Sequence, residues 1–122
     1  MISLELAKKY CRIDSNSDDE ILTAFIISSL SEISRFCNRL FFQFQADFDE
    51  VENNLSDIEK QNAVIIENLS YTEKEKINLA RLKLICDWYE YRGNVVELSL
   101  DTAPYGVRDL LQPYFIYNLV AD

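Results

Sequence analysis

The chain has 122 residues, of which 48% are hydrophobic and 27% are charged, so it can bury the core of one domain. Its formal net charge of −9 argues against a protein that holds nucleic acid through a basic surface. With only two Gly and two Pro, the sequence also lacks the turn residues that a β-rich fold needs. We therefore expect a single all-α domain over residues 1–122.

Two helices are predicted at the start of the chain. Residues 3–13 favour a short helix in which Ser3 is the N-cap. A long helix is predicted over residues 17–40, where apolar residues recur at helical spacing. The sequence SDDE marks its start as a capping box, with Ser17 as the N-cap and Glu20 three residues later. The expected core residues of this helix are Phe25, Ile33 and Phe36.

Residues 41–71 break the helical pattern. The sequence FFQFQADF alternates Phe and Ala with polar residues, which is the periodicity of a strand, and NAVIIENL is a second β-branched run. Residues 41–60 also contain six acidic side chains and one basic one. We expect an irregular acidic arm with a possible β-hairpin.

A second long helix is predicted over residues 73–92. The sequence TEKE is a capping box with Thr72 as the N-cap and Glu75 returning the bond, and Gly93 is suited to the C-terminal cap. The helix is apolar on most sides, which predicts burial on most sides. It should pack antiparallel to the first long helix. Its expected core residues are Leu84, Ile85 and Trp88.

The sequence APYGVRDLLQPYF (103–115) is unusual for the end of a chain, because terminal segments are normally polar. Gly106 is expected to permit a tight turn, after which a short helix is ended by Pro113. The apolar residues of this helix either cap the core of their own subunit or contact another chain. For residues 115–120 we favour contact with another chain, so removal of residues 114–122 should leave the fold intact.

Residues for catalysis and for metal binding are scarce. The chain has no His, and it contains no nucleophile elbow, phosphate-binding glycine loop or HExxH sequence. The stretch DSNSD matches the first ligand positions of a calcium loop, but Asp19 stands where that loop needs Gly and Phe25 where it needs Glu. We predict no enzyme activity, no cofactor and no metal.

Three cysteines, Cys11, Cys37 and Cys86, are far apart in the sequence and odd in number. A disulfide is therefore not expected, and each thiol is interpreted as a small buried hydrophobe in a reducing compartment. The first residues lack the basic and apolar regions of a signal peptide, and no apolar run reaches the length of a membrane span.

Four stretches, in chain order, resemble the small head-tail connector proteins of tailed phages, the HK97 gp6-like adaptor family: ISLELAKKYCRID, DDEILTAFIISSLSEISRFCNR, INLARLKLICDWYEYRGNV and APYGVRDLLQPYF. The most specific parts are WYEYR (88–92) and PYGVRDLLQPYF (104–115). The resemblance covers most of the chain but not the 41–71 arm.

The resemblance implies a structural, non-enzymatic protein whose copies form a ring beneath the portal at the capsid vertex. Such a ring extends the channel through which DNA passes without specific binding, and it offers a platform for a downstream neck or tail-completion protein. The protein would lie in the virion, and in the host cytoplasm during assembly, with no membrane contact.

The alternative is a small cytosolic helical protein-protein interaction or regulatory module of phage origin; a small enzyme has the least support. The candidate residues for a subunit or partner interface are Arg92, Gly106, Val107, Leu110, Leu111, Pro113, Tyr114, Phe115 and Tyr117.

Overall fold

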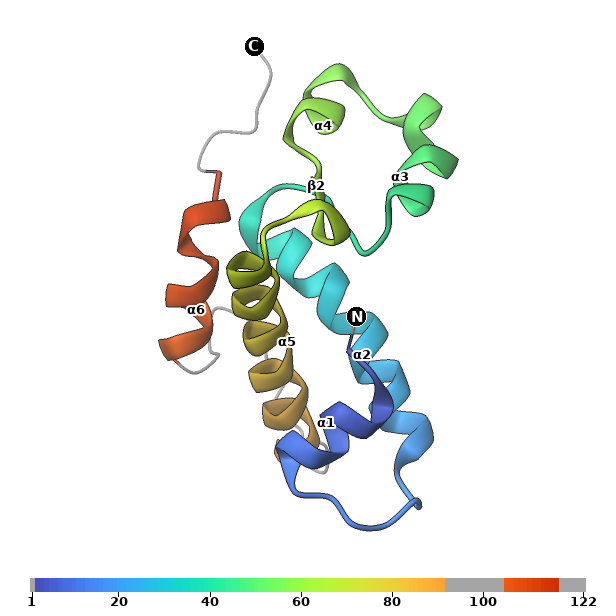
Figure 1. Cartoon of the computed structure of the whole chain (residues 1–122), viewed down its shortest axis with the longest axis vertical. Coiled ribbons are helices and arrows are strands. Elements are labelled where there is room, and N and C mark those ends of the chain that lie inside the picture. Colours follow the sequence, from blue (N-terminus) through green and yellow to red (C-terminus); the bar gives the residue numbers. More distant parts are fainter. Residues whose placement is uncertain (1, 92–104, 117–122) are drawn as a thin grey trace.

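A computed structural model describes residues 2–91 and 105–116. These residues form six α-helices and one very small sheet, so the expectation of an all-α fold is confirmed (Figure 1). The helices are α1 (Leu4–Cys11), α2 (Asp19–Cys37), α3 (Gln45–Val51), α4 (Asp57–Asn62), α5 (Tyr71–Tyr91) and α6 (Tyr105–Leu111). The chain also forms short 3-10 helices, which are η1 (Glu52–Asn54) after α3, η2 (Ile66–Asn68) before α5 and η3 (Gln112–Tyr114) after α6.

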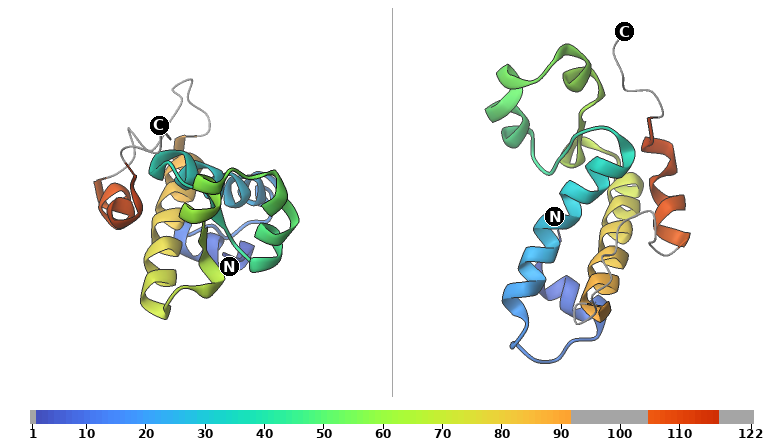
Figure 2. Two further views of the ribbon diagram at one scale, coloured as in Figure 1. Left: turned by 90° about the horizontal axis from the view of Figure 1, so that it is seen from above. Right: turned by 180° about the vertical axis from the view of Figure 1, so that it is seen from behind.

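The long helices α2 and α5 pack side by side and run antiparallel, as predicted (Figures 1 and 2). Two contacts fix this direction. The hydroxyl of Tyr89, near the end of α5, donates to Asp18 at the start of α2 over 2.7 Å. In the middle of both helices, Arg81 Nε donates to Ser29 Oγ over 2.9 Å. Helix α1 contacts both long helices, and α6 lies along α5.

Helix α1 begins as expected, because Ser3 Oγ accepts a hydrogen bond from the Leu6 backbone N–H at 3.0 Å. The capping box predicted for α2 is wrong. The N-cap is Asp18, whose side chain makes no cap bond, while the hydroxyl of Ser17 lies 3.0 Å from that of Ser15. The carboxylate of Asp18 instead accepts from α5, so a tertiary contact replaces the local cap.

The predicted start of α5 is also displaced. Helix α5 begins at Tyr71, and Ser70 Oγ accepts from the Glu73 backbone N–H at 3.3 Å. The cap is therefore Ser70 rather than Thr72. Ser70 and Glu73 have the same three-residue spacing as Thr72 and Glu75, so the chain offers two overlapping capping boxes and uses the first. The described part of α5 ends at Tyr91, so the predicted cap at Gly93 lies outside the described residues.

The segment between the long helices, residues 41–69, forms the arm, which projects beyond the end of the bundle where α2 ends and α5 begins (Figures 1 and 2). The predicted β-hairpin is wrong. Strands β1 (Phe41–Phe42) and β2 (Val64–Ile65) pair in parallel, and α3, η1 and α4 form the crossover that parallel strands require. The alternating pattern ends because the Asp47 carboxylate accepts from the Phe44 N–H and starts α3.

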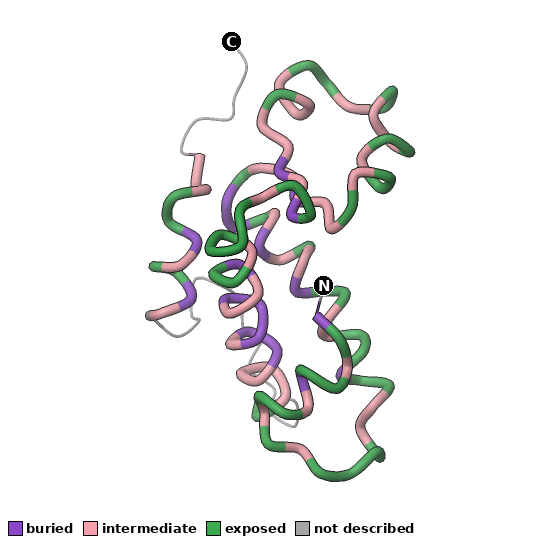
Figure 3. Tube along the Cα trace, in the orientation of Figure 1, coloured by how far each residue is buried: buried purple, intermediate pink, exposed green. Residues whose placement is uncertain are grey.

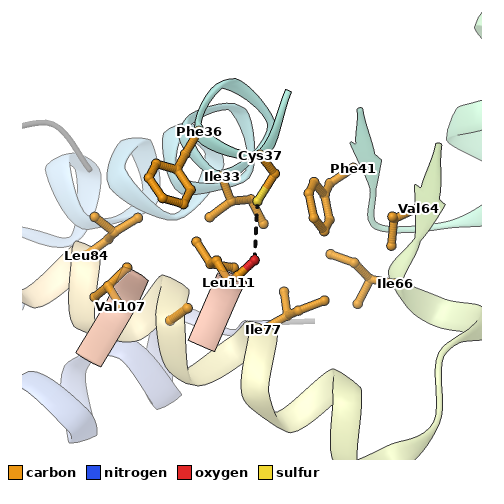
Figure 4. Close-up of a cluster of buried hydrophobic side chains, with 11 residues drawn as sticks. Ile33, Phe36, Cys37, Phe41, Val64, Ile66, Ile77, Leu84, Val107 and Leu111 are labelled. Atoms are coloured by element: carbon orange, nitrogen blue, oxygen red, sulfur yellow. Dashed lines mark hydrogen bonds between the residues drawn. The ribbon is translucent and has the colours of Figure 1, made fainter. Parts of the chain in front are cut away.

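The core has two clusters that share α2 and α5. The first lies where α2, α5, α6 and the two strands meet (Figure 4). The second lies between α1, α2 and α5, and the buried residues of α5 lie in the middle of this helix, from Ile77 to Ile85 (Figure 3). Of the six expected core residues, four are buried, Ile33, Phe36, Leu84 and Ile85, and two are half-buried, Phe25 and Trp88.

The expectation that no disulfide forms is wrong. Cys11 of α1 and Cys86 of α5 are bonded, with a Cα–Cα distance of 5.4 Å across 75 residues of sequence. Spacing along the chain gave no signal, because the pair is created by the packing of α1 on α5. Cys37 remains a free, buried thiol. None of the described helices is long and apolar enough to span a bilayer.

Candidate functional site

The closing segment, residues 105–116, comprises α6, η3 and the two residues after them. It packs along α5 and against the C-terminal end of α2. Val107 and Leu111 are both 0% exposed and belong to the first core cluster, which also contains Phe36 and Leu84 (Figure 4). These two side chains are therefore core residues of their own subunit, which is one of the two alternatives that the sequence left open for this helix.

Two aromatic pairs anchor the end of this segment. The ring centroids of Phe115 and Phe36 are 5.5 Å apart, and those of Tyr114 and Phe41 are 5.8 Å apart. The Tyr114 hydroxyl also donates to Glu73 Oε1 over 3.1 Å. Partial burial, together with the neighbouring carboxylate, raises the pKa of Tyr114 to about 12. Tyr114 and Phe115 are thus half-buried on their own subunit, where contact with another chain was expected for Phe115.

Main-chain bonds continue this attachment to the last described residue. The N–H of Ile116 donates to the Cys37 carbonyl over 2.9 Å, and the Asn38 side-chain amide donates back to the Ile116 carbonyl over 2.9 Å. Arg39 donates from Nη1 to the Tyr114 carbonyl at 3.3 Å and from Nε to the Asn62 carbonyl at 2.7 Å. One side chain at the end of α2 therefore joins the closing segment to the arm.

The outer side of the closing segment is polar and exposed. Its exposed side chains are Arg108, Asp109, Gln112 and Pro113. The Arg108 guanidinium carbon lies 5.7 Å from the centre of the Phe36 ring, so this cation is held over the core. Leu110 is half-buried beside these residues. Of these residues, Leu110 and Pro113 belong to the predicted interface.

Gly106 does not form the expected tight turn before the short helix, because it lies within α6 and its φ is not positive. A side chain there would meet the stem of Lys83 at 3.6 Å, which is an ordinary contact distance. The glycine thus leaves room for Lys83 to lie across the start of α6. Two other interface candidates, Arg92 and Tyr117, lie outside the described residues.

A buried polar network, which the sequence analysis missed, lies between α2, α5 and the start of the arm. Arg81 is 3% exposed and donates to Ser29 Oγ, to Gln43 Oε1 at 2.9 Å and to the Ile26 carbonyl at 3.0 Å. Burial lowers the pKa of Arg81 to about 10, so the side chain is charged at neutral pH. The only sequence signal is a single Arg among apolar residues on a helix that is buried on most sides.

Two open grooves mark the surface. A groove of about 530 Å³ lies between the second half of α2, β1 and α4. The second, which we call the α1–α5 groove, has a volume of about 710 Å³ and includes Leu6 and Tyr10 of α1 and Tyr71 and Leu79 of α5 in its lining. Lys74 and Lys76 also line it.

In the described part of the chain, the metal-ligating side chains are dispersed and the free cysteine is buried. Residues 2–91 and 105–116 hold no group of three or more metal-ligating His, Cys, Asp or Glu side chains. Burial raises the pKa of the Cys37 thiol to about 12, so this sulfur stays protonated and is a poor nucleophile. The contacts described above join the closing segment, the arm and the two long helices to one another.

Comparison with known proteins agrees with this reading. A family model described as phage gp6-like head-tail connector protein matches residues 1–114. The match therefore includes the arm, which the resemblance read from the sequence had left out, and most of the closing segment. No curated protein and no solved structure matches the chain.

Proposed function

The chain belongs to the phage gp6-like head-tail connector family, and on this premise we propose that it is a structural adaptor without enzymatic activity. Its copies form a ring beneath the portal, extend the DNA channel and join the capsid to a downstream neck or tail-completion protein. The protein is part of the virion and assembles in the host cytoplasm. The observation that carries this proposal is the family match over residues 1–114.

The closing segment supports a role in joining proteins. Its apolar residues are held by the core of their own subunit, so its outer face is presented on a firm support rather than on a free tail. Arg108, Asp109, Gln112 and Pro113 form this outer face. A polar face of this kind fits a partner that binds to an already folded adaptor, and we assign it to the portal or the neck protein.

The net charge supports the passage of DNA. Each copy carries −9, so a ring of copies has a strongly negative field. Cationic walls would bind phosphates and slow the movement of DNA, whereas a negative wall avoids such binding. DNA therefore passes through the channel without specific contacts.

The proposal is tested by mixing the purified protein with capsids that contain the portal and separating bound from free protein by sedimentation. We expect co-sedimentation with these capsids and none with capsids assembled without a portal. A variant that combines Arg108→Glu with Asp109→Lys, both at exposed positions, should fold normally and bind less. A strict monomer that binds neither capsid would contradict the proposal and favour the regulatory module of phage origin.

A further inference from the structure

We propose that neighbouring copies of this chain are joined by docking of the acidic arm of one copy into the α1–α5 groove of the next. This inference rests on the proposed ring and names its contact surfaces. It is drawn from the exposure of the groove and from the uneven distribution of charge over the molecule.

The α1–α5 groove exposes large apolar side chains. Tyr71 is 78% exposed, and Leu6 and Tyr10 are each 40% exposed. The remaining apolar lining comes from Leu79 and Leu82. Apolar side chains gathered in a hollow of the surface are typical of a place that another protein covers.

The chain segments that form this groove are basic relative to the rest of the molecule. Helices α1 and α5, together with the cap residue Arg12, hold seven basic and five acidic side chains, whereas the whole chain carries −9. The groove itself is lined by Lys74, Glu75 and Lys76, of which Glu75 and Lys76 are exposed, so two basic side chains and one acidic side chain give its lining a net positive charge. An acidic segment is the occupant that this charge selects.

The arm supplies such a segment. Residues 41–62 contain six acidic side chains and one basic one. Asp47, Asp49, Glu50 and Asp57 are all exposed. The arm also exposes an apolar side chain, Phe44, by 40%, which suits the apolar lining of the groove. The arm therefore offers both kinds of contact that the groove accepts.

The two surfaces are different, so the contact between copies is head-to-tail. A head-to-tail contact that closes on itself generates a ring. The arm projects beyond one end of the helical bundle, where a neighbouring copy can reach it (Figures 1 and 2). Because every copy carries −9, assembly also requires a local attraction that offsets the general repulsion.

The test uses charge reversal on the full chain. The groove variant combines Lys74→Glu with Lys76→Glu, and the arm variant combines Asp49→Lys with Glu50→Lys. The control variant combines Asp14→Lys with Glu90→Lys. It changes the net charge by the same amount as the arm variant, but at exposed positions outside the arm. Self-association is measured by sedimentation velocity at low salt, alone and on portal-containing capsids, and circular dichroism checks the fold.

We expect the association constant of each of the two test variants to be at least about tenfold lower than that of the wild type, because like charges then face each other. An equimolar mixture of the groove and arm variants should restore assembly, since each groove then meets an arm of opposite charge. The control should assemble at least as well as the wild type.

A groove variant that assembles like the wild type would overturn the docking contact while leaving the ring proposal intact. The docking contact would also be overturned if the arm variant and the control variant both assembled better than the wild type, because the change in net charge alone would then explain the result. Failure of the wild type to associate, both alone and on capsids, would overturn the ring and this contact together.

Discussion

Arg81 Nε donates to Ser29 Oγ over 2.9 Å in a position where the guanidinium is only 3% exposed. The contact joins α5 to α2, and Gln43 extends it into the arm. Buried polar groups destabilise a fold when their partners are removed. We predict that Arg81→Ala lowers the free energy of unfolding by about 2–4 kcal/mol, through a cavity and lost hydrogen bonds.

This prediction is checked by urea denaturation followed by circular dichroism. Arg12→Ala serves as the control, because Arg12 is exposed and its loss should change the unfolding free energy by no more than about 0.5 kcal/mol. Equal midpoints for the Arg81→Ala variant and the wild type would show that the network contributes nothing to stability.

The Cys11–Cys86 disulfide closes a loop across 75 residues of sequence. A crosslink over so long a loop restricts the unfolded chain and typically stabilises a protein by about 2–4 kcal/mol. We predict that a reductant lowers the denaturation midpoint of the wild type but not that of a Cys11→Ser, Cys86→Ser double variant. Alkylation of three thiols per chain before reduction would contradict the bond.

Tyr114 makes the stability of the fold depend on pH in the alkaline range. Its pKa is raised from 10.0 to about 12 by burial and by the hydrogen bond to Glu73, so the folded state favours the protonated phenol. Stability from this group is full below pH 10 and is lost as the pH rises to about 12. We predict that Tyr114→Phe reduces the loss of stability over this range.

The measurement for Tyr114 is a series of denaturation midpoints from neutral pH to pH 11. Tyr71→Phe is the matched control, because Tyr71 is 78% exposed and its removal should leave the pH profile unchanged. Parallel profiles for the wild type and Tyr114→Phe would contradict the role of Tyr114.

The sequence predicted those features that depend on apolar periodicity. Both long helices and their antiparallel packing appear as expected, and the family read from the closing motif is confirmed by the match over residues 1–114. Cap positions were less accurate. Ser70 and Thr72 are both suitable caps, and the local sequence does not distinguish them, although the helix begins two residues earlier with Ser70 as its cap.

Features created by tertiary contact could not be read in this way. The disulfide forms because α1 crosses α5, and the partners of Arg81 come from two separate segments, α2 and the arm. The same reason explains why the contact of Phe115 was not predicted. Its ring packs on Phe36 near the end of α2, a residue that is far from it in the sequence. An apolar side chain in a terminal segment does not reveal which chain will cover it.

Two truncations separate the anchored part of the closing segment from the residues beyond it. Deletion of residues 117–122 keeps the Phe115–Phe36 pair and the Ile116 hydrogen bonds, so we predict unchanged stability. Deletion of residues 114–122 removes both aromatic pairs and should lower the unfolding free energy by more than about 3 kcal/mol. This replaces the expectation that the longer deletion leaves the fold intact.

Thermal unfolding and capsid co-sedimentation of both truncated proteins test the prediction. If residues 117–122 contact a neighbouring copy or a neck protein, the shorter deletion folds normally yet assembles poorly. A longer deletion with the melting temperature of the wild type would show that the anchors around Tyr114 and Phe115 contribute little.

The last prediction concerns DNA. The chain has 21 acidic and 12 basic residues, and of the basic ones Arg81 is buried and Arg39 is bound to backbone carbonyls, so acids outnumber the cations that could meet phosphates. We predict that duplex DNA is not retained at about 0.15 M salt, where phosphate contacts are already weakened. A variant with Asp49→Lys and Glu50→Lys should gain binding at low salt, because these exposed positions on α3 would then carry basic side chains. Gel-shift titrations of both proteins give the measurement. Binding of the wild type at about 0.15 M salt would show that its acidic surface does not keep DNA away, and the channel would need another explanation.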